Sequence, residues 1–251
     1  AASRYFRPDF YLPDERMYIE LTTMRQPLVT RKNRKLRLVR ELYPSLRIKL
    51  LYRRDLERLR AAWESAALAP QRGLGEVVFS EREITARARS LACQIADEWL
   101  REGLITEPAP VVLAANEGAH RVSVLLRREL EAIGIHAAHD QMHRNRFRSG
   151  SETRQIRISR PRPLDLAGRR VLLVEDAVST GLSASAATDW LARQGSAEWR
   201  ICSLLDRRPA RLLDIPLEWV AFDAPDQPLA GFGLTLHRQF RDLPAIFNAV
   251  D

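Results

Sequence analysis

The sequence predicts an α/β protein with a parallel sheet, preceded by a small basic α/β domain. From about residue 80 onward, segments with apolar residues at helical spacing alternate with short apolar runs, a pattern typical of a parallel sheet covered by helices. With 251 residues and 45% apolar side chains, the chain is long enough to bury such a core. Residues 1–70 hold 16 Lys or Arg against 8 Asp or Glu, and the totals of 40 and 32 leave 24 of each sign for the remainder. Two domains of different charge, residues 1–72 and 73–251, are therefore expected.

The front domain is expected to contain a hairpin, a basic helix, a third strand and a second helix. Aromatic and branched residues on either side of Pro13-Asp14-Glu15 indicate two strands joined by a turn. The expected elements are strands at residues 7–12, 17–22 and 47–52 and helices at 32–43 and 54–67. The basic face of the first helix either contacts only solvent or binds an acidic partner, so nucleic acid is a candidate partner for residues 1–70.

The second domain is expected to alternate strands and helices along its length. The expected elements are helices at residues 80–101, 118–133 and 183–193 and strands at 110–115, 169–174, 198–205 and 219–223. Residues 141–155 lack periodicity and are expected to form a long mobile loop of the kind that often closes over an active site.

The cellular location is predicted from what the sequence lacks. No apolar stretch is long enough to cross a bilayer and no signal-peptide pattern opens the chain, so a cytoplasmic protein without membrane association is expected. Cys93 and Cys202 show no metal-ligand spacing, and free thiols in a reducing compartment are expected.

The strongest chemical signal follows the apolar run at residues 171–174, which is typical of a buried parallel strand. This run ends in Glu175 and Asp176, and ligands of open α/β sheets bind at the carboxyl ends of the strands. Residues 179–183, Ser-Thr-Gly-Leu-Ser, then supply hydroxyls and a glycine before a helix, which suits a phosphate group. The carboxylates suit two vicinal ribose hydroxyls and a hydrated Mg²⁺. The alternative is an ordinary helix start, capped by Ser or Thr, that binds no ligand.

The whole string Val-Leu-Leu-Val-Glu-Asp-Ala-Val-Ser-Thr-Gly-Leu-Ser, residues 171–183, resembles the phosphoribosyl pyrophosphate motif of type I phosphoribosyltransferases. The resemblance covers most of residues 75–251 and is greatest to the hypoxanthine-guanine branch. It implies the parallel-sheet type I phosphoribosyltransferase fold, phosphoribosyl pyrophosphate and a purine base as partners, Mg²⁺ as cofactor, and a homo-oligomer. It also implies catalytic roles for Glu175, Asp176 and Ser179, and 5-phosphate binding by Ser179, Thr180, Gly181, Leu182 and Ser183.

Five further segments match the same family in the same order along the chain. The residues implied by these matches are Asn116, Glu117, Gly118 and Arg241 for pyrophosphate, Arg207, Trp219 and Val220 for the base, and Asp226, with Glu175 and Asp176, for Mg²⁺. An aromatic ring suits stacking on a purine. Taken singly, Trp219 is more often a core residue and Arg241 more often a surface charge.

The sequence departs from the family pattern at three places. Ser179 stands where the family usually has an aspartate credited with accepting the purine N7 proton, and serine is a poor base. Glu117 stands where a lysine is common, and its charge repels pyrophosphate unless Mg²⁺ or the loop backbone intervenes. Arg144-Asn145 replaces a Ser-Tyr pair of the mobile loop.

The front domain resembles the PD-(D/E)XK nuclease core in the order of its charged residues. Asp9 and Glu20 lie on strands expected to pair, but Thr22 occupies the usual lysine position. There are three alternatives: Lys32 or Lys35 reaches the acids from the helix, the domain is an inactive module that can bind nucleic acid, or its helix is merely a solvated surface.

Three functions follow from these patterns. The leading hypothesis is purine phosphoribosyl transfer with release of pyrophosphate. The second is a sensor or defence effector that binds a ribosyl phosphate without turnover and acts through a nucleic-acid-binding front domain. The third is metal-dependent cleavage of nucleic acid by that domain.

Overall fold

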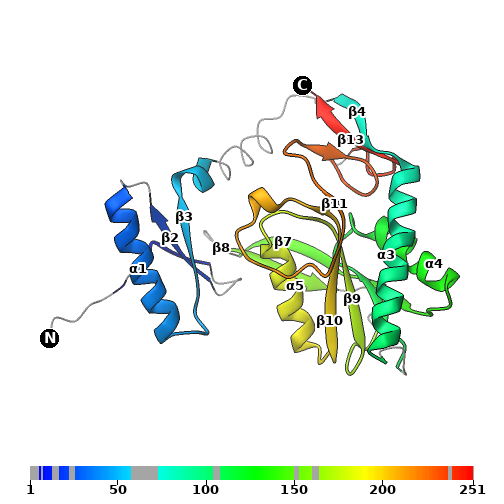
Figure 1. Ribbon diagram of the computed structural model, residues 1–251, viewed down its shortest axis with the longest axis horizontal. Coiled ribbons are helices and arrows are strands. Elements are labelled where there is room, and N and C mark those ends of the chain that lie inside the picture. The colour runs from blue at the N-terminus through cyan, green and yellow to red at the C-terminus, as the bar shows by residue number, and fades with distance from the viewer. Residues whose placement is uncertain are drawn as a thin grey trace. The chain divides into compact units, whose positions relative to one another are not determined.

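The computed structural model describes residues 6, 8–12, 17–22, 26–57, 73–103, 108–149, 153–159, 164–236 and 239–250. The chain divides into two compact units, Ala1–Ala69 and Pro70–Asp251, so the division falls close to the boundary proposed at residue 73 (Figure 1). Among the described residues, no helix is long and apolar enough to cross a membrane. Cys93 and Cys202 are both free thiols, and burial raises the pKa of Cys202 to about 12.

The first unit is a three-stranded sheet with one helix packed on it. Strand β1 (Phe10–Leu12) is antiparallel to β2 (Met17–Thr22), which is parallel to β3 (Arg47–Tyr52). Helix α1 (Gln26–Leu42) connects β2 to β3 and buries Leu36 against the sheet. It begins six residues before the predicted helix. Pro27 and Arg31 interrupt the helical spacing of apolar residues in this first part, so the sequence pattern did not indicate a helix there. Of the predicted helix at 54–67, residues 53–57 are helical and the rest lies outside the described residues.

The second unit is built on a parallel sheet, as predicted, with five strands, of which β6 was not predicted. The strand order is β11-β10-β9-β5-β6, and these strands are β5 (Val111–Ala114), β6 (Ala138–Gln141), β9 (Arg170–Val178), β10 (Glu198–Asp206) and β11 (Trp219–Asp223). Helices α3 (Glu81–Arg101) and α4 (His120–Ala132) bury their apolar residues on one face, and α5 (Leu182–Arg193) covers the other (Figure 1). Helix α3 starts with a capping box, in which Ser80 and Glu83 satisfy each other's main-chain N–H groups.

The register of this sheet brings two separate loops to one edge. Ala114 of β5 lies opposite Val174 of β9, so the loop that follows β5 and the carboxylates that follow Val174 emerge together at the carboxyl edge of the sheet. This is the edge at which open α/β sheets bind ligands. Strand β9 continues beyond the predicted end at residue 174, because its pairing with β10 extends as far as Val178.

Several strands of the second unit were not predicted. A small antiparallel sheet has the order β12-β13-β4 and consists of β4 (Gly73–Phe79), β12 (Leu229–Ala230) and β13 (Ile246–Val250). Residues 141–155 were expected to be a loop, but β7 (His143–Ser149) and β8 (Thr153–Ser159) pair there as an antiparallel ribbon. A separate two-stranded ribbon is held by main-chain hydrogen bonds, so its sequence need not alternate apolar and polar residues.

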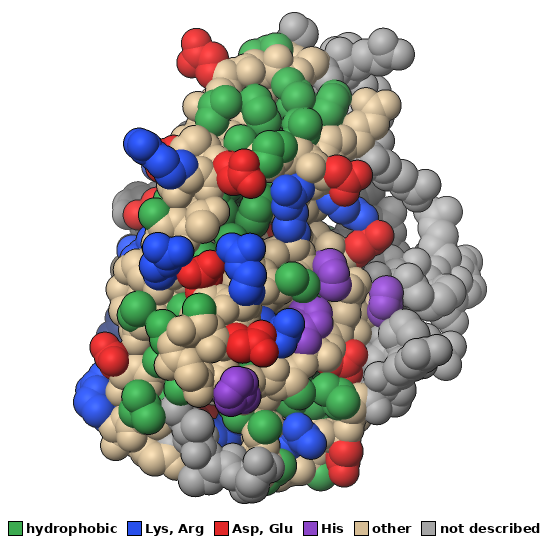
Figure 2. Space-filling view, turned by 90° about the vertical axis from the view of Figure 1, so that its right-hand side faces the viewer, with side chains coloured by type: hydrophobic (Ala, Val, Ile, Leu, Met, Phe, Trp, Pro, Cys, Tyr) green, Lys and Arg blue, Asp and Glu red, His purple; other side chains and the backbone are tan. Residues whose placement is uncertain are grey.

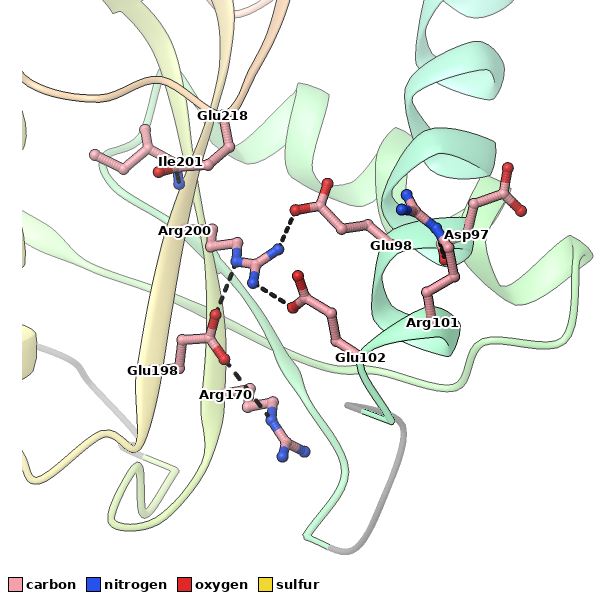
Figure 3. A network of polar contacts seen from close by, with 9 residues as sticks. All are labelled: Asp97, Glu98, Arg101, Glu102, Arg170, Glu198, Arg200, Ile201 and Glu218. Atoms are coloured by element: carbon pink, nitrogen blue, oxygen red, sulfur yellow. Dashed lines mark hydrogen bonds and ion pairs between the residues drawn. The ribbon is translucent and has the colours of Figure 1, made fainter.

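Charged side chains of both signs cover the surface of the second unit, and some of them form ion pairs. Acidic and basic side chains are interspersed on the face shown in Figure 2, in keeping with the balance of 24 against 24 in this part of the sequence. The largest cluster ties β10 to α3 (Figure 3). In it, the Arg200 guanidinium, on a side chain that is 17% exposed, bonds to the carboxylates of Glu98, Glu102 and Glu198.

Replacement of Arg200 with alanine is expected to lower the free energy of unfolding by about 2 kcal/mol. Three carboxylates would then face one another without their shared cation, which costs less here than in a fully buried site because water reaches them. Urea denaturation would measure the loss. Arg101→Ala is the control, since Arg101 lies on α3, as Glu98 does, and its described hydrogen bond goes only to the Asp97 carbonyl. Equal stability of the two variants would contradict the role given to Arg200.

Candidate active site

A cavity of about 280 Å³ lies at the carboxyl edge of the parallel sheet. Its walls come from the loop after β5, the middle of β9, the start of β7 and the chain between β12 and β13. The lining residues are Asn116, Glu117, Gly118, His143, Asp176, Gly233, Thr235 and Arg241. All four residues expected to contact pyrophosphate therefore line this cavity, although Arg241 is more than 120 residues away from the others in sequence.

Asp176 is held in place by Asn116. The Asn116 side-chain amide donates to Asp176 Oδ1 at 2.9 Å, and its oxygen accepts from the Ala119 main-chain N–H at 2.9 Å. These two bonds fix both the amide and the carboxylate. Glu175 was expected to share the ligand with Asp176, but Glu175 is only 1% exposed and is not among the cavity-lining residues. Its Oε2 accepts from the same Asn116 amide at 3.4 Å, so of the two carboxylates only that of Asp176 faces the cavity.

The cavity wall packs so closely that two of its positions require glycine. A Cβ atom on Gly118 would lie 2.1 Å from Asp176 Oδ2 and 3.0 Å from Asn116 Oδ1. A Cβ atom on Gly233 would lie 2.1 Å from the Gly118 carbonyl oxygen, and Gly233 also has a φ of +96°. Because it lacks a Cβ atom, Gly118 can lie close to the Asp176 carboxylate. For the same reason, Gly233 can lie close to the loop that contains Gly118.

The charges in the cavity are partly neutralised by an ion pair. Glu117 Oε2 lies 2.6 Å from Arg241 Nη1, and the two side chains are 69% and 34% exposed. Arg241 Nε is buried and has no hydrogen-bond partner among the described residues. An incoming anion can therefore gain bonds from Arg241 but has to compete with Glu117 for it.

Residues 179–183 form the turn that was predicted from their sequence. Gly181 has a φ of +81° and directly precedes α5, so the loop leads into a helix N-terminus. The Leu182 N–H donates to Thr180 Oγ1 at 3.4 Å. Ser179, Thr180, Leu182 and Ser183 are all partly exposed, and Gly181 is buried. A helix N-terminus with a left-handed glycine before it is a common anion-binding arrangement.

The residues expected to bind the base are not brought to this cavity. Trp219 is 5% exposed and belongs to the core on the α3 and α4 face, and it is not among the cavity-lining residues. The Val220 carbonyl accepts a hydrogen bond from Arg87 at 2.7 Å. Arg207 donates to the Gln227 carbonyl at 3.0 Å, and burial lowers the pKa of its guanidinium while Asp226 opposes that shift.

The three carboxylates expected to bind Mg²⁺ are not all brought to the cavity either. Glu175 is buried, Asp176 lines the cavity and Asp226 is an exposed residue beside Arg207. Within the described part of the chain, no group of three or more His, Cys, Asp or Glu residues is arranged to hold a metal ion.

Three residues that were not predicted also line the cavity, namely His143, Gly233 and Thr235. Only the Gly231-x-Gly233 spacing gave a signal, since paired glycines indicate a tight approach of main chain.

The front unit has a second cluster of charged residues. Lys32 Nζ lies 2.7 Å from Glu20 Oε1, and the Glu20 side chain is 7% exposed. The Leu21 N–H donates to Asp9 Oδ2 at 2.8 Å, so Asp9 reaches across to the strand that carries Glu20. Glu20 Oε2 and Thr22 Oγ1 are buried without a hydrogen-bond partner among the described residues. Lys32, rather than the exposed Lys35, is thus the lysine that reaches one of the two acids, Glu20.

Comparison with known proteins identifies the family. The phosphoribosyl transferase domain model matches residues 82–236. A hypoxanthine phosphoribosyltransferase of Salmonella typhimurium is 30% identical over 176 residues, which are 70% of this chain and 95% of that protein. A hypoxanthine-guanine phosphoribosyltransferase of Streptococcus thermophilus is 22% identical over 177 residues, 70% of this chain and 93% of that protein. A solved Trypanosoma cruzi hypoxanthine phosphoribosyl transferase has the same fold, with a TM-score of 0.63 at 23% identity over 70% of this chain and 92% of that one. From residue 82 onward, this chain belongs to the phosphoribosyl transferase domain family.

Proposed function

We propose that the second unit transfers the 5-phosphoribosyl group of phosphoribosyl pyrophosphate to a purine base of the hypoxanthine or guanine type, with release of pyrophosphate. The observation that carries this proposal is the arrangement at the sheet edge. There, residues 179–183 lead into a helix N-terminus, and Asp176 and Arg241 line the same cavity. The relatives named as hypoxanthine phosphoribosyltransferases favour turnover over the sensing alternative.

Each part of the donor has a matching group in this arrangement. The loop amides and hydroxyls of residues 179–183 would bind the 5-phosphate, and Asp176 would accept hydrogen bonds from the ribose hydroxyls. Gly118 and Arg241 would contact pyrophosphate. Catalysis would come from orientation of the two reactants and from stabilisation of the charge that develops as pyrophosphate departs. Arg207 remains the candidate for orienting the base, since Trp219 belongs to the core.

Mg²⁺ fits this site as an ion that arrives with the donor. One cavity carboxylate, Asp176, is enough for it, because Mg²⁺ usually binds one or two carboxylates together with substrate phosphates and water. When bound, it would neutralise charge on the phosphate oxygens.

A cytoplasmic location and self-association into an oligomer stay predictions.

The base specificity is tested by a panel of bases. Purified protein, Mg²⁺ and phosphoribosyl pyrophosphate are incubated with hypoxanthine, guanine, xanthine or adenine, and nucleotide and pyrophosphate are measured. We expect turnover with at least one 6-oxopurine. Ser179→Asp is expected to raise kcat with that base by about 10- to 100-fold, because it adds a proton acceptor. Ser179→Asn is the matched control. Equal effects of both substitutions would show that a base at this position is not what limits turnover.

Removal of the Glu117 charge is expected to strengthen donor binding. In Glu117→Gln, Arg241 no longer has a carboxylate partner at 2.6 Å, and the KM for phosphoribosyl pyrophosphate should fall about 3- to 10-fold. Steady-state kinetics at fixed Mg²⁺ measures this change. The control is Glu131→Gln, which removes an exposed carboxylate paired with Arg127 outside the cavity. A KM that rises in Glu117→Gln would show instead that Glu117 assists the donor.

A second function is proposed for the front unit, namely metal-dependent cleavage of nucleic acid. It rests on the ion pair of Lys32 with buried Glu20 and on the approach of Asp9 to the same strand. Two acids and a lysine are the groups needed to hold Mg²⁺ and stabilise an attacking water. The exposed basic residues of α1 would attract the phosphate backbone.

Plasmid nicking by the full chain tests this second function. With Mg²⁺ or Mn²⁺, we expect nicking that Asp9→Ala and Glu20→Ala each abolish and that Lys35→Ala leaves unchanged. Undiminished nicking in both acid variants would point to a contaminating nuclease and remove the proposal, as would the lack of nicking by the unaltered protein.

A further inference from the structure

Beneath the loop 179–183 lies a buried ion pair between Arg211 and Asp206. Asp206 is the last residue of β10, and its side chain is 5% exposed. It accepts hydrogen bonds from Arg211 Nη2 and, at 2.9 Å, from Arg208 Nε. The two arginines differ in burial, since the side chain of Arg211 is 13% exposed and that of Arg208 is 75% exposed. Arg211 is therefore part of the interior at this edge, whereas Arg208 lies on the surface.

The Arg211 guanidinium binds the main chain of the phosphate loop from below. Its Nε donates to the Ser179 carbonyl at 3.1 Å and its Nη2 to the Val178 carbonyl at 3.3 Å. The main chain near Arg211 continues this pattern. The Arg207 N–H donates to the Val178 carbonyl at 3.0 Å, and the N–H groups that follow Arg211 donate to the Thr180 carbonyl at 2.9 and 3.0 Å. Three consecutive loop carbonyls thus accept from the segment 207–213.

This arrangement determines where the loop amides point. In a trans peptide the carbonyl of one residue and the N–H of the next point in opposite directions. Because the carbonyls of residues 178–180 point toward the segment 207–213, the N–H groups of residues 179–181 point away from it. Successive N–H groups directed to one side form an anion-binding concavity. Gly181 completes the contact, because a Cβ there would lie 2.7 Å from the Leu213 carbonyl and 3.2 Å from Arg211 Cδ.

Arginine suits this position better than lysine. The guanidinium presents five N–H donors in one rigid plane, so it can bind two carbonyls and a carboxylate at once. Asp206 fixes that plane and compensates the buried charge. A lysine ammonium would supply the charge for Asp206 without the same fixed pair of main-chain bonds.

We infer that Arg211 is a positioning residue for the 5-phosphate of the ribosyl donor. It would not touch the ligand but would hold the loop 178–181 with its amides directed at the phosphate. The inference rests on the proposed transferase function. The inference predicts that loss of Arg211 weakens binding of the 5-phosphate part of the donor and leaves pyrophosphate binding unchanged. A general effect on folding would weaken binding of both parts.

The experiment compares Arg211→Ala, Arg211→Lys and Arg208→Ala. Arg208→Ala is the matched control, since Arg208 bonds to the same carboxylate but makes no described contact with the loop. Calorimetry measures binding of two probes, ribose 5-phosphate and Mg²⁺-pyrophosphate, and kinetics measures kcat and KM for the donor and the base. Circular dichroism first establishes which variants fold.

For Arg211→Ala we expect Kd for ribose 5-phosphate and KM for the donor to rise about 10- to 100-fold, with Kd for pyrophosphate and KM for the base within about twofold of the unaltered protein. Arg211→Lys should recover part of the loss and Arg208→Ala should change neither constant. If Arg211→Ala does not fold, the same differential in Arg211→Lys decides the matter. Unchanged ribose 5-phosphate binding, or an equal loss for pyrophosphate, would overturn the inference alone. If the unaltered protein binds neither probe, the proposed transferase function fails, and the inference fails with it.

Discussion

Replacement of Asp176 with alanine is expected to lower kcat/KM for nucleotide formation by about 100- to 1,000-fold. Asp176 lines the cavity and is fixed by a 2.9 Å hydrogen bond from Asn116, so its charge is already positioned before a ligand arrives. Removal of one pre-positioned electrostatic group from an active site has effects of this size. Steady-state kinetics with saturating base and varied donor measures the loss.

A second substitution separates the charge of Asp176 from its shape. Asp176→Asn keeps an oxygen that can accept the Asn116 hydrogen bond but lacks the negative charge. It should retain the fold and lose most of the activity. Asp165→Asn, which changes an exposed carboxylate outside the cavity, should be fully active. Near-normal turnover in Asp176→Asn would contradict the role given to the carboxylate.

Replacement of Gly118 with alanine is expected to lower kcat/KM by about 10- to 100-fold. The added methyl group would lie 2.1 Å from Asp176 Oδ2, so the carboxylate has to move away from its bond with Asn116. A displacement of about 1 Å at a reacting centre costs roughly 100-fold in rate. The free energy of unfolding should fall by only about 1 to 2 kcal/mol, because the carboxylate can shift toward the open cavity.

Gly73→Ala serves as the control for this substitution. A Cβ atom on Gly73 would meet only Val250, at 3.9 Å, and Gly73 has no left-handed φ. It should leave both activity and stability unchanged. An active Gly118→Ala variant would show that the close approach of Gly118 to Asp176 is not needed for catalysis.

The parallel sheet and the phosphate loop were predictable because both have local causes. Apolar runs flanked by helical segments indicate buried parallel strands, and Gly181 before a helix indicates a turn with a left-handed residue. The pyrophosphate wall was predictable only through the family resemblance. No local pattern relates Asn116 to Arg241, which the fold alone brings into one cavity.

The sequence did not determine where the residues predicted for the base and for the metal lie within the fold. Glu175 and Asp176 were treated as a pair, but Asp176 lines the cavity while Glu175 is 1% exposed and does not line it. Trp219 was assigned to the base from its place in the order of the family matches, but it is 5% exposed and packs in the core. Order along a chain does not determine depth within a sheet.

His143 and Thr235 could not be predicted from any pattern. Both lie just outside regular core elements, at the start of a ribbon and after a tight turn, and a single polar residue in such a segment has no periodicity to distinguish it. Their presence in the cavity depends on contacts between distant parts of the chain.

The product balance of a single reaction tests the proposed phosphoribosyl transfer most directly. Purified protein is mixed with Mg²⁺, phosphoribosyl pyrophosphate and labelled hypoxanthine or guanine, and labelled nucleotide and pyrophosphate are quantified over time. We expect equal amounts of the two products from at least one of these bases and loss of both in Asp176→Ala. Tight donor binding with no nucleotide formed from either base would contradict the proposed transfer.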